Sequence, residues 1–167
     1  MPRSSNVARE GFAENKTVFG KILRGELPAD VLYEDDQVLV FRDIKPVSEH
    51  HALIIPKRLI DHAGWCTSED VPLLRHMETI ALQTLQAAYP SVDVQKAHAA
   101  GTVSLGFHKF PLITVHHLHL HCIYPMPVRW TMPMARLLAF PQDFGWFYHS
   151  SQSVIEEAAM RPSPNNL

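Results

Sequence analysis

The sequence predicts an α+β domain: an antiparallel sheet of about five strands, with one long helix and one or two short ones. Two observations predict this class. Short apolar and β-branched runs outnumber helical patterns, and most connections between them are short. The 167 residues suffice for one domain with a sizeable core. We expect that domain to span residues 17–160, between a flexible N-terminal segment (1–16) and a flexible tail (161–167).

A short helix and a hairpin are expected first. Residues 17–24 (TVFGKILR) place apolar side chains on one side, with Thr17 as the candidate N-cap and Gly25 just past the last turn. Two strand-like runs, 31–34 and 37–43, are joined by a tight acidic turn. Such a pair predicts a β-hairpin.

A core strand and one long amphipathic helix follow. Residues 51–56 (HALIIP) are apolar, partly β-branched and bounded by a proline, which predicts a buried strand. The helix begins at Thr67 or Ser68 and ends at Tyr89-Pro90, and its expected core face consists of Leu74, Met77, Ala81, Leu85 and Ala88. The remaining expected elements are strands around 100–107 and 115–123 and a short helix at 132–139.

Composition limits the classes of partner. The formal net charge is −2 without a run of like charges, so stable nucleic-acid binding is not expected, whereas a small phosphorylated ligand needs only local donors. Cys66 and Cys122 form no CxxC pair, which favours reduced thiols in an intracellular protein. The sequence has no apolar run of signal-peptide or membrane-span length, so no membrane association is expected. We expect a cytoplasmic or nuclear protein; Arg3 and Arg9 make a mitochondrial location the weaker alternative.

The unusual feature is histidine. There are eleven, and five of them fall between positions 108 and 121. Residues 116–122 spell H-H-L-H-L-H-C. Because side chains alternate between the faces of a strand, His117, His119 and His121 are expected on one face, opposite two leucines and Cys122.

Three interpretations of this face compete. It is a solvated polar face, a metal site, or a catalytic centre. Neutral imidazole is a common metal ligand, but the first and last of the three histidines are roughly 13 Å apart along a strand. At most two of them can therefore share an ion unless the strand bends strongly. The residues that could complete such a site are His50, His51, His62 and His108.

The third interpretation is nucleophilic catalysis at phosphorus. A neutral imidazole has one nitrogen with a free lone pair. If a backbone carbonyl accepts the Nδ1 proton, Nε2 is left to attack, and the flanking imidazoles can donate to phosphoryl oxygens or to a leaving group. The middle residue, His119, is then the best nucleophile.

Residues 117–123 (HLHLHCI) resemble the H-φ-H-φ-H-φ-φ motif of the histidine-triad (HIT) superfamily. Four upstream segments are similar, in order and spacing, to the Hint branch of purine nucleoside phosphoramidases: VFGKI at 18–22, EDD at 34–36, FRDIKP at 41–46 and HALIIPK at 51–57. LGFH at 105–108 is more similar to the Hint-3 and aprataxin branches. The resemblance covers residues 17–124, most of the domain.

The resemblance implies a HIT-like α+β fold, usually homodimeric, that hydrolyses AMP or GMP phosphoramidates through a nucleotidyl-histidine intermediate. By that resemblance His119 is the nucleophile, and His117 orients it, chiefly through its backbone carbonyl. His121 and Thr114 contact the phosphate, and Asp43 accepts hydrogen bonds from the ribose hydroxyls. The remaining implied residues are an apolar purine slot (Phe19, Ile22, Phe41, Ile44 and Leu53) and His51 as support beside the triad.

Two departures from the Hint pattern affect the expected chemistry. Leu112-Ile113-Thr114 stands where Hint proteins usually carry Gly-Gln-Ser, so a leaving-group glutamine is missing and His108 or His116 is expected to substitute for it. The cysteine pair that some relatives use for zinc is absent, so neither a metal nor another cofactor is expected.

Several alternatives stay open on the sequence alone. The substrate could be a dinucleoside polyphosphate or a DNA adenylate instead of a phosphoramidate, although the trailing zinc finger of aprataxin is absent. The domain could also be a nucleotide-binding interaction module without catalysis. The residues of the apolar slot could be ordinary core, Asp43 a turn residue and Thr114 an ordinary strand residue. Trp146 and Phe147 could be core or could close a neighbouring subunit's pocket.

Overall fold

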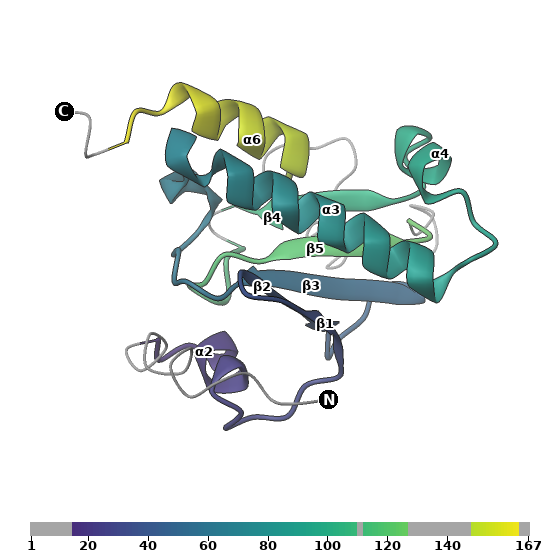
Figure 1. The fold of residues 1–167 in the computed structure, drawn as a ribbon, viewed down its shortest axis with the longest axis horizontal. Coiled ribbons are helices and arrows are strands. Elements are labelled where there is room, and N and C mark those ends of the chain that lie inside the picture. The colour runs from purple at the N-terminus through teal and green to yellow at the C-terminus, as the bar shows by residue number, and fades with distance from the viewer. Residues whose placement is uncertain (1–14, 110–111, 127–147, 164–167) are drawn as a thin grey trace.

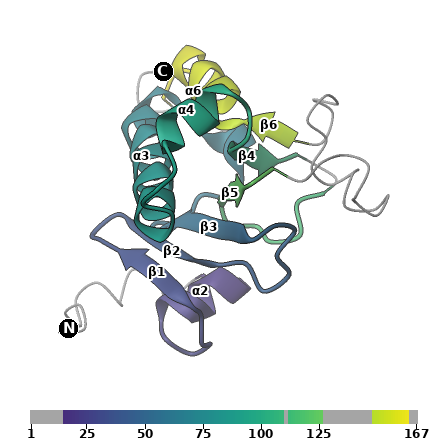
Figure 2. The same cartoon turned by 90° about the vertical axis from the view of Figure 1, so that its right-hand side faces the viewer.

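Six antiparallel strands form one sheet in the order β1-β2-β3-β5-β4-β6 (Figures 1 and 2). The computed structural model describes residues 15–109, 112–126 and 148–163. The strands are β1 (Val31–Glu34), β2 (Val38–Arg42), β3 (His50–Pro56), β4 (Ser104–His108), β5 (Leu120–Tyr124) and β6 (Tyr148–Ser150). The predicted α+β class is confirmed, with six strands within the described ranges instead of about five.

The N-terminal helix and hairpin form where the sequence predicts them. Helix α2 (Val18–Leu23) begins after Thr17, whose hydroxyl accepts a hydrogen bond from the Gly20 amide at 3.1 Å. It ends before Gly25, whose φ of +74° is a left-handed conformation that glycine adopts without strain. β1 and β2 then pair as the two arms of the hairpin. Both ends of α2 are therefore defined by local structure, the first by the Thr17 cap and the last by Gly25.

The register of the central strands sorts side chains onto two faces. β3 pairs with β5 so that Leu53 lies opposite His121 and Ile54 lies opposite Leu120. Residues that face one another across antiparallel strands point to the same side of the sheet. Ile54 and Leu120 belong to the large core, whereas Leu53 belongs to a second cluster, which includes Phe19 of α2. The histidine-bearing face is therefore the one that α2 covers.

The other face of the sheet is covered by helices. Figures 1 and 2 show α3 (Val71–Ala88), α4 (Val94–Ala99) and α6 (Ser151–Met160) together on this side, with α2 beside β1 and β2. The predicted core face of α3 is buried at Leu74, Met77, Ala81 and Leu85, while Ala88 in its last turn is exposed. Across the described residues, no helix is both long and apolar enough to span a bilayer.

Two short 3-10 turns lead into α3. They are η1 (Ala63–Trp65) and η2 (Ser68–Asp70), and the second begins where the sequence predicts the helix start. Asp70 Oδ2 accepts a hydrogen bond from the Thr67 amide at 2.8 Å, which satisfies a free donor at the helix N-terminus.

Part of the sequence-based secondary structure is wrong. The predicted strand at 115–123 begins only at Leu120, which pairs with Ile54 at the end of the ladder between β3 and β5. The Leu118 amide instead donates to the Ile60 carbonyl at 2.7 Å. The sequence also missed α4, α6 and β6. The helix expected at 132–139, and the residues Trp146 and Phe147, lie outside the described residues.

Candidate active site

Three buried histidines meet on the α2 side of the sheet. His117 and His119 lie in the turn of chain that leads into β5, and His121 lies in β5 itself. The Phe19 ring of α2 packs edge-on against both His117 and His119, with ring centroids 5.9 and 5.2 Å apart. Alternation thus places the three imidazoles on one side of the chain, although only His121 is in a regular strand. The residues between and after them pack into the core on the other side: Leu118, Leu120 and Cys122.

His119 is held in one tautomer by the backbone. Its Nδ1 lies 2.7 Å from the carbonyl oxygen of His117, which can only accept, so Nδ1 carries the proton. The lone pair of Nε2 is then available. His119 is only 9% exposed, so most of its side chain is covered by protein. Nε2 of His119 therefore has the unprotonated lone pair that a nucleophilic imidazole requires.

The ring of His117 is hydrogen-bonded at both nitrogens. Nε2 donates to the carbonyl oxygen of Pro56 at 2.8 Å, and Nδ1 lies 2.8 Å from the side-chain nitrogen of Asn15. Asn15 lies N-terminal to the predicted start of the domain and is 3% exposed. The His117 ring is therefore held between Asn15, which precedes α2, and Pro56, the last residue of β3.

A second hydrogen-bonded chain lies behind His121. His51 Nε2 and His121 Nδ1 are 2.9 Å apart. The Val47 amide donates to His51 Nδ1 at 3.3 Å, so the His51 proton is on Nε2 and is donated to His121. The Asp43 carboxylate lies 3.5 Å from the same His51 nitrogen. His121 consequently carries its own proton on Nε2, as a hydrogen-bond donor.

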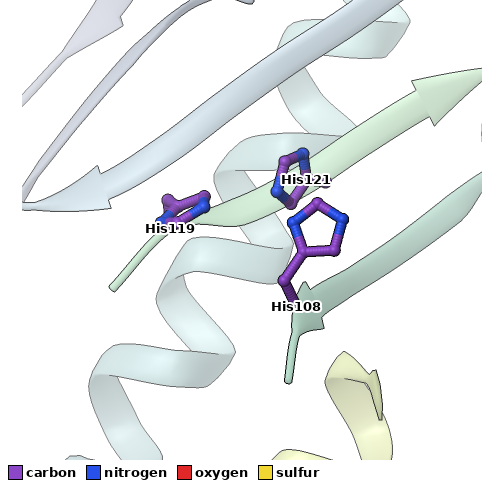
Figure 3. A group of neighbouring side chains, drawn as sticks. All are labelled: His108, His119 and His121. Carbon is purple, nitrogen blue, oxygen red and sulfur yellow. The ribbon is translucent and has the colours of Figure 1, made fainter. Parts of the chain in front are cut away.

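His108 joins the triad from the neighbouring strand. Figure 3 shows its ring beside His121, with His119 further along. The His108 ring centroid lies 4.5 Å from that of His121 and 6.4 Å from that of His119. The ring of Tyr148, in β6, lies near both His108 and His121, with its centroid 5.8 Å from that of His108 and 6.4 Å from that of His121. A side chain at Gly106, the residue opposite His121, would overlap this tyrosine ring, so glycine there makes room for it.

The predicted purine slot is only partly assembled as expected. Phe19, Phe41 and Leu53 form one buried cluster, and Ile22 packs against it. The Phe19 and Phe41 rings meet edge-on at 5.6 Å. Ile44 is 93% exposed and lies apart from this cluster. The cluster therefore forms an apolar wall next to His119, to which Ile44 does not contribute in this structure.

A small pocket adjoins His119. Its lining includes His108, His117 and His119, together with Asp61 and His62 from the loop after β3. Thr114 and His116 lie outside this group: both are exposed. The His116 ring instead makes a 2.7 Å contact with the Asp61 carboxylate. Of the two histidines that the sequence offers for the leaving group, the structure brings His108 to the triad.

Residues 16–132 match a known protein family, whose model is described as "Scavenger mRNA decapping enzyme C-term binding". An uncharacterized HIT-like protein of Synechococcus elongatus is 38% identical over 119 residues, which is 68% of this chain and 94% of the relative. The chain belongs to the histidine-triad (HIT) family. The family predicted from the motifs is thereby confirmed.

Two further HIT relatives have named activities. The bifunctional adenosine 5′-phosphosulfate phosphorylase/adenylylsulfatase HINT4 of Arabidopsis thaliana is 37% identical over 116 residues, covering 68% of this chain and 73% of that protein. The solved structure of a HIT family hydrolase from Clostridium thermocellum superposes with a TM-score of 0.53 at 26% identity, covering 71% of this chain and 96% of the other. These similarities support the predicted assignment to the hydrolases.

The HIT triad is electrostatically neutral. Burial lowers the pKa of His117 to about 4, although the hydrogen bond to the Pro56 carbonyl by itself raises that pKa. Burial also lowers the pKa of His119, and it lowers that of His121 well below the ordinary value of 6.5, helped by the neighbouring imidazoles. All three rings are therefore uncharged at neutral pH, which is the state that leaves a lone pair on His119.

Among the residues that the structure describes, two groups of side chains have ligand atoms close enough to consider a metal ion. They are His108, His119 and His121, and Asp43, His51 and His121, with ligand atoms within 4.8 Å of one another in each group. Zinc–nitrogen bonds of about 2.0–2.1 Å require ligand atoms roughly 3.4 Å apart. Both groups also include His121, whose Nδ1 accepts from His51 and whose Nε2 is protonated. The hydrogen bonds favour a proton-donating role for His121 over metal ligation.

Two residues that contact the histidines of this site, Asn15 and Tyr148, are not predicted from the sequence. Asn15 is 102 positions from His117, and no local pattern marks that contact. Tyr148 reaches His108 through β6, a three-residue strand too short to stand out by alternation. A usable signal existed only for Asn15, because it lies two residues before the helix N-cap that the sequence identifies.

Proposed function

We propose that the protein hydrolyses conjugates of a purine nucleoside monophosphate, in the first place phosphoramidates such as AMP-lysine, through a nucleotidyl-His119 intermediate. The observation that carries this proposal is the 2.7 Å contact between His119 Nδ1 and the His117 carbonyl oxygen. This contact leaves Nε2 as the attacking atom. Beside it lies the apolar cluster of Phe19, Phe41 and Leu53, against which a flat purine ring could pack.

The reaction proceeds in two displacements. The Nε2 lone pair attacks the α-phosphorus, the Nε2–P bond forms, and the bond from phosphorus to the leaving nitrogen breaks. The leaving nitrogen takes up a proton and departs as an amine. Water then attacks the same phosphorus, the Nε2–P bond breaks, and the nucleoside monophosphate is released with His119 restored. Because His119 Nδ1 keeps its proton throughout, the His117 carbonyl stabilises the positive charge of the intermediate.

The neighbouring residues supply three further functions. His121 Nε2–H donates to a phosphoryl oxygen, oriented by His51. His108 provides the proton for the leaving group, in place of the glutamine that the sequence lacks. Asp43 accepts from the ribose hydroxyls; its Oδ1 already receives the Lys45 amide at 2.7 Å, which fixes the carboxylate. We retain Thr114 as a phosphate contact only if nucleotide binding draws its loop inward.

Adenylyl sulfate is the second candidate substrate. The observation that favours it is the 37% identity to HINT4, whose name records activity on adenosine 5′-phosphosulfate. The two candidates share every step at phosphorus and differ in the leaving group, which is a neutral amine in one and a sulfate in the other. An amine must be protonated to depart, whereas sulfate leaves as an anion. His108 is therefore needed more for the phosphoramidate.

A substrate panel tests the proposal. The purified full chain is assayed with AMP-lysine, adenosine 5′-phosphosulfate, diadenosine polyphosphate and adenylated nicked DNA. We expect the highest kcat/KM with AMP-lysine, no turnover by His119→Ala, and near-normal AMP binding by that variant. His98→Ala, an imidazole removed from α4, is the matched control and should keep full activity. Turnover by His119→Ala would exclude the mechanism, and AMP binding without turnover of any substrate would favour a non-catalytic module.

A further inference from the structure

We propose that Asn15 is a positioning residue: its amide holds the His117 imidazole uncharged and fixed, and so fixes the carbonyl that orients His119. The inference rests on the proposed role of His119 as the nucleophile. The role of Asn15 itself rests on a continuous chain of hydrogen bonds that begins in the residues before α2.

The orientation of the Asn15 amide is determined by Thr17. Asn15 Oδ1 lies 3.1 Å from the Thr17 backbone nitrogen and 2.7 Å from the Thr17 hydroxyl. A backbone N–H can only donate, so the atom facing it must be the amide oxygen. The NH₂ group therefore points the other way, toward His117.

The amide in turn determines the state of His117. Asn15 Nδ2 lies 2.8 Å from His117 Nδ1 and can only donate, so Nδ1 is an acceptor without a proton. The single ring proton is on Nε2 and is donated to the Pro56 carbonyl oxygen at 2.8 Å. A second proton on Nδ1 would point at the NH₂ group. The two contacts together exclude the imidazolium form.

The fixed ring adjoins the peptide that orients the nucleophile. The peptide group between His117 and Leu118 is bonded on both sides: its N–H donates to the Ile60 carbonyl at 2.7 Å, and its C=O accepts from His119 Nδ1 at 2.7 Å. Anchoring the His117 side chain removes the remaining freedom of this unit. Keeping the ring uncharged also avoids a cation beside the cationic nucleotidyl-His119 intermediate.

Asn15 is itself held on several sides. Its carbonyl oxygen accepts from Arg24 Nη1 at 2.7 Å, at the other end of α2. Gly20, in the helix, approaches so closely that any side chain there would overlap the Asn15 backbone and side chain. Asn15 is 3% exposed. A loosely placed polar side chain would have none of these constraints, so the segment before α2 is built to present this amide.

Charge at His117 is the property to measure. The titratable side chains that line the pocket with it are His119, His108, His62 and Asp61. The full chain is labelled with ¹⁵N, and the His117 ring nitrogens are followed by NMR as the pH is lowered. In the unchanged protein, Nδ1 should stay unprotonated and Nε2 protonated down to about pH 4.

Two variants separate the outcomes. Asn15→Asp keeps the size and the acceptor for Thr17 but replaces the donor by a carboxylate, so His117 should be doubly protonated at neutral pH. Asn15→Ala removes the donor that faces Nδ1, so it should raise the pKa of His117, while burial still keeps that pKa below 6.5. Both should lower kcat, by up to about 100-fold from misplacement of the nucleophile, with a smaller change in KM. Asp93→Ala, which removes the cap of α4, is the control for a general loss of stability.

The results divide clearly. A raised pKa of His117 with a fall in kcat that Asp93→Ala does not reproduce supports the positioning role. An unchanged His117 titration in Asn15→Asp overturns it, as does unchanged kcat despite a charged His117. The NMR readout needs no substrate, and His119→Ala should leave His117 uncharged while abolishing turnover. Failure of the proposed function and failure of this inference are therefore distinguishable.

Discussion

His51 Nε2 donates a hydrogen bond to His121 Nδ1 across 2.9 Å, joining two strands at the floor of the site. Because His121 Nδ1 accepts this bond, the ring proton of His121 is on Nε2. From there it can form a hydrogen bond to a phosphoryl oxygen. We predict that His51→Leu lowers kcat by up to about 100-fold, because His121 loses the contact that orients it. Steady-state kinetics on AMP-lysine measures the effect, and full activity of His51→Leu would show that His121 needs no orientation.

The adjacent residue, His50, provides a matched comparison. It lies on the opposite face of β3, is 1% exposed, and neither ring nitrogen has a hydrogen-bond partner among the described residues. Its ring packs edge-on against Tyr89 at 5.9 Å. His50→Leu should therefore retain full kcat, whereas His51→Leu should not.

His50 also predicts how stability depends on pH. Burial lowers the pKa of His50 to about 4, below its ordinary value of 6.5. The unfolded chain therefore binds a proton between these values that the folded chain does not, so the free energy of unfolding is full above pH 6.5 and falls as the pH drops toward 4. Each such group contributes at most about 1.4 kcal/mol per pH unit. Urea unfolding at several pH values should show a shallower dependence in His50→Leu, and an unchanged slope would contradict the lowered pKa.

Asp43 should act in binding the ribose. Removing a charged acceptor of hydrogen bonds loses about 1.5–3 kcal/mol, so Asp43→Ala should weaken AMP binding roughly 10- to 150-fold, as measured by calorimetry. The difference between the unchanged protein and Asp43→Ala should shrink for a nucleotide that lacks the ribose 2′- and 3′-hydroxyls. An equal loss with that analogue would place Asp43 elsewhere, for example as support for His51, 3.5 Å away.

Gly20 and Gly25 give opposite predictions for the same substitution. An alanine at Gly20 would overlap Asn15, so Gly20→Ala should displace Asn15 and lower kcat. At Gly25 nothing lies within 4 Å, but φ is +74°, so Gly25→Ala should lower the free energy of unfolding by about 1–2 kcal/mol and leave kcat unchanged. Thermal unfolding and kinetics on both variants test this pair; equal kinetic effects would contradict it.

Local patterns predicted much of the fold. The capped helix before Gly25, the hairpin, the core strand at 51–56 and the long helix each follow from periodicity and termini. Alternation along residues 117–122 also separated three imidazoles from three core side chains, although His117 and His119 precede the regular strand. The alternation survives because Leu118 is anchored to the core side and to the Ile60 carbonyl.

The remainder depends on contacts between distant parts of the chain. The β3–β5 ladder ends at the pair of Ile54 and Leu120, and this register is not visible in either segment alone. The contacts of Asn15 with His117 and of Tyr148 with His108 join segments that no spacing rule connects. Ile44 was assigned to the slot by resemblance, yet its side chain is exposed, since it follows the end of β2 in a turn.

The central claim is that Nε2 of His119 becomes covalently nucleotidylated. The direct measurement is rapid mixing of the protein with AMP-lysine, alkaline quenching within one turnover to preserve the phosphorus–nitrogen bond, and mass spectrometry of the peptide that contains residues 117–121. We predict an adenylyl group on His119 that forms and decays at rates matching kcat, and no adduct in His119→Ala. Turnover without any adduct on this peptide, or an adduct on His117 or His121, would contradict it.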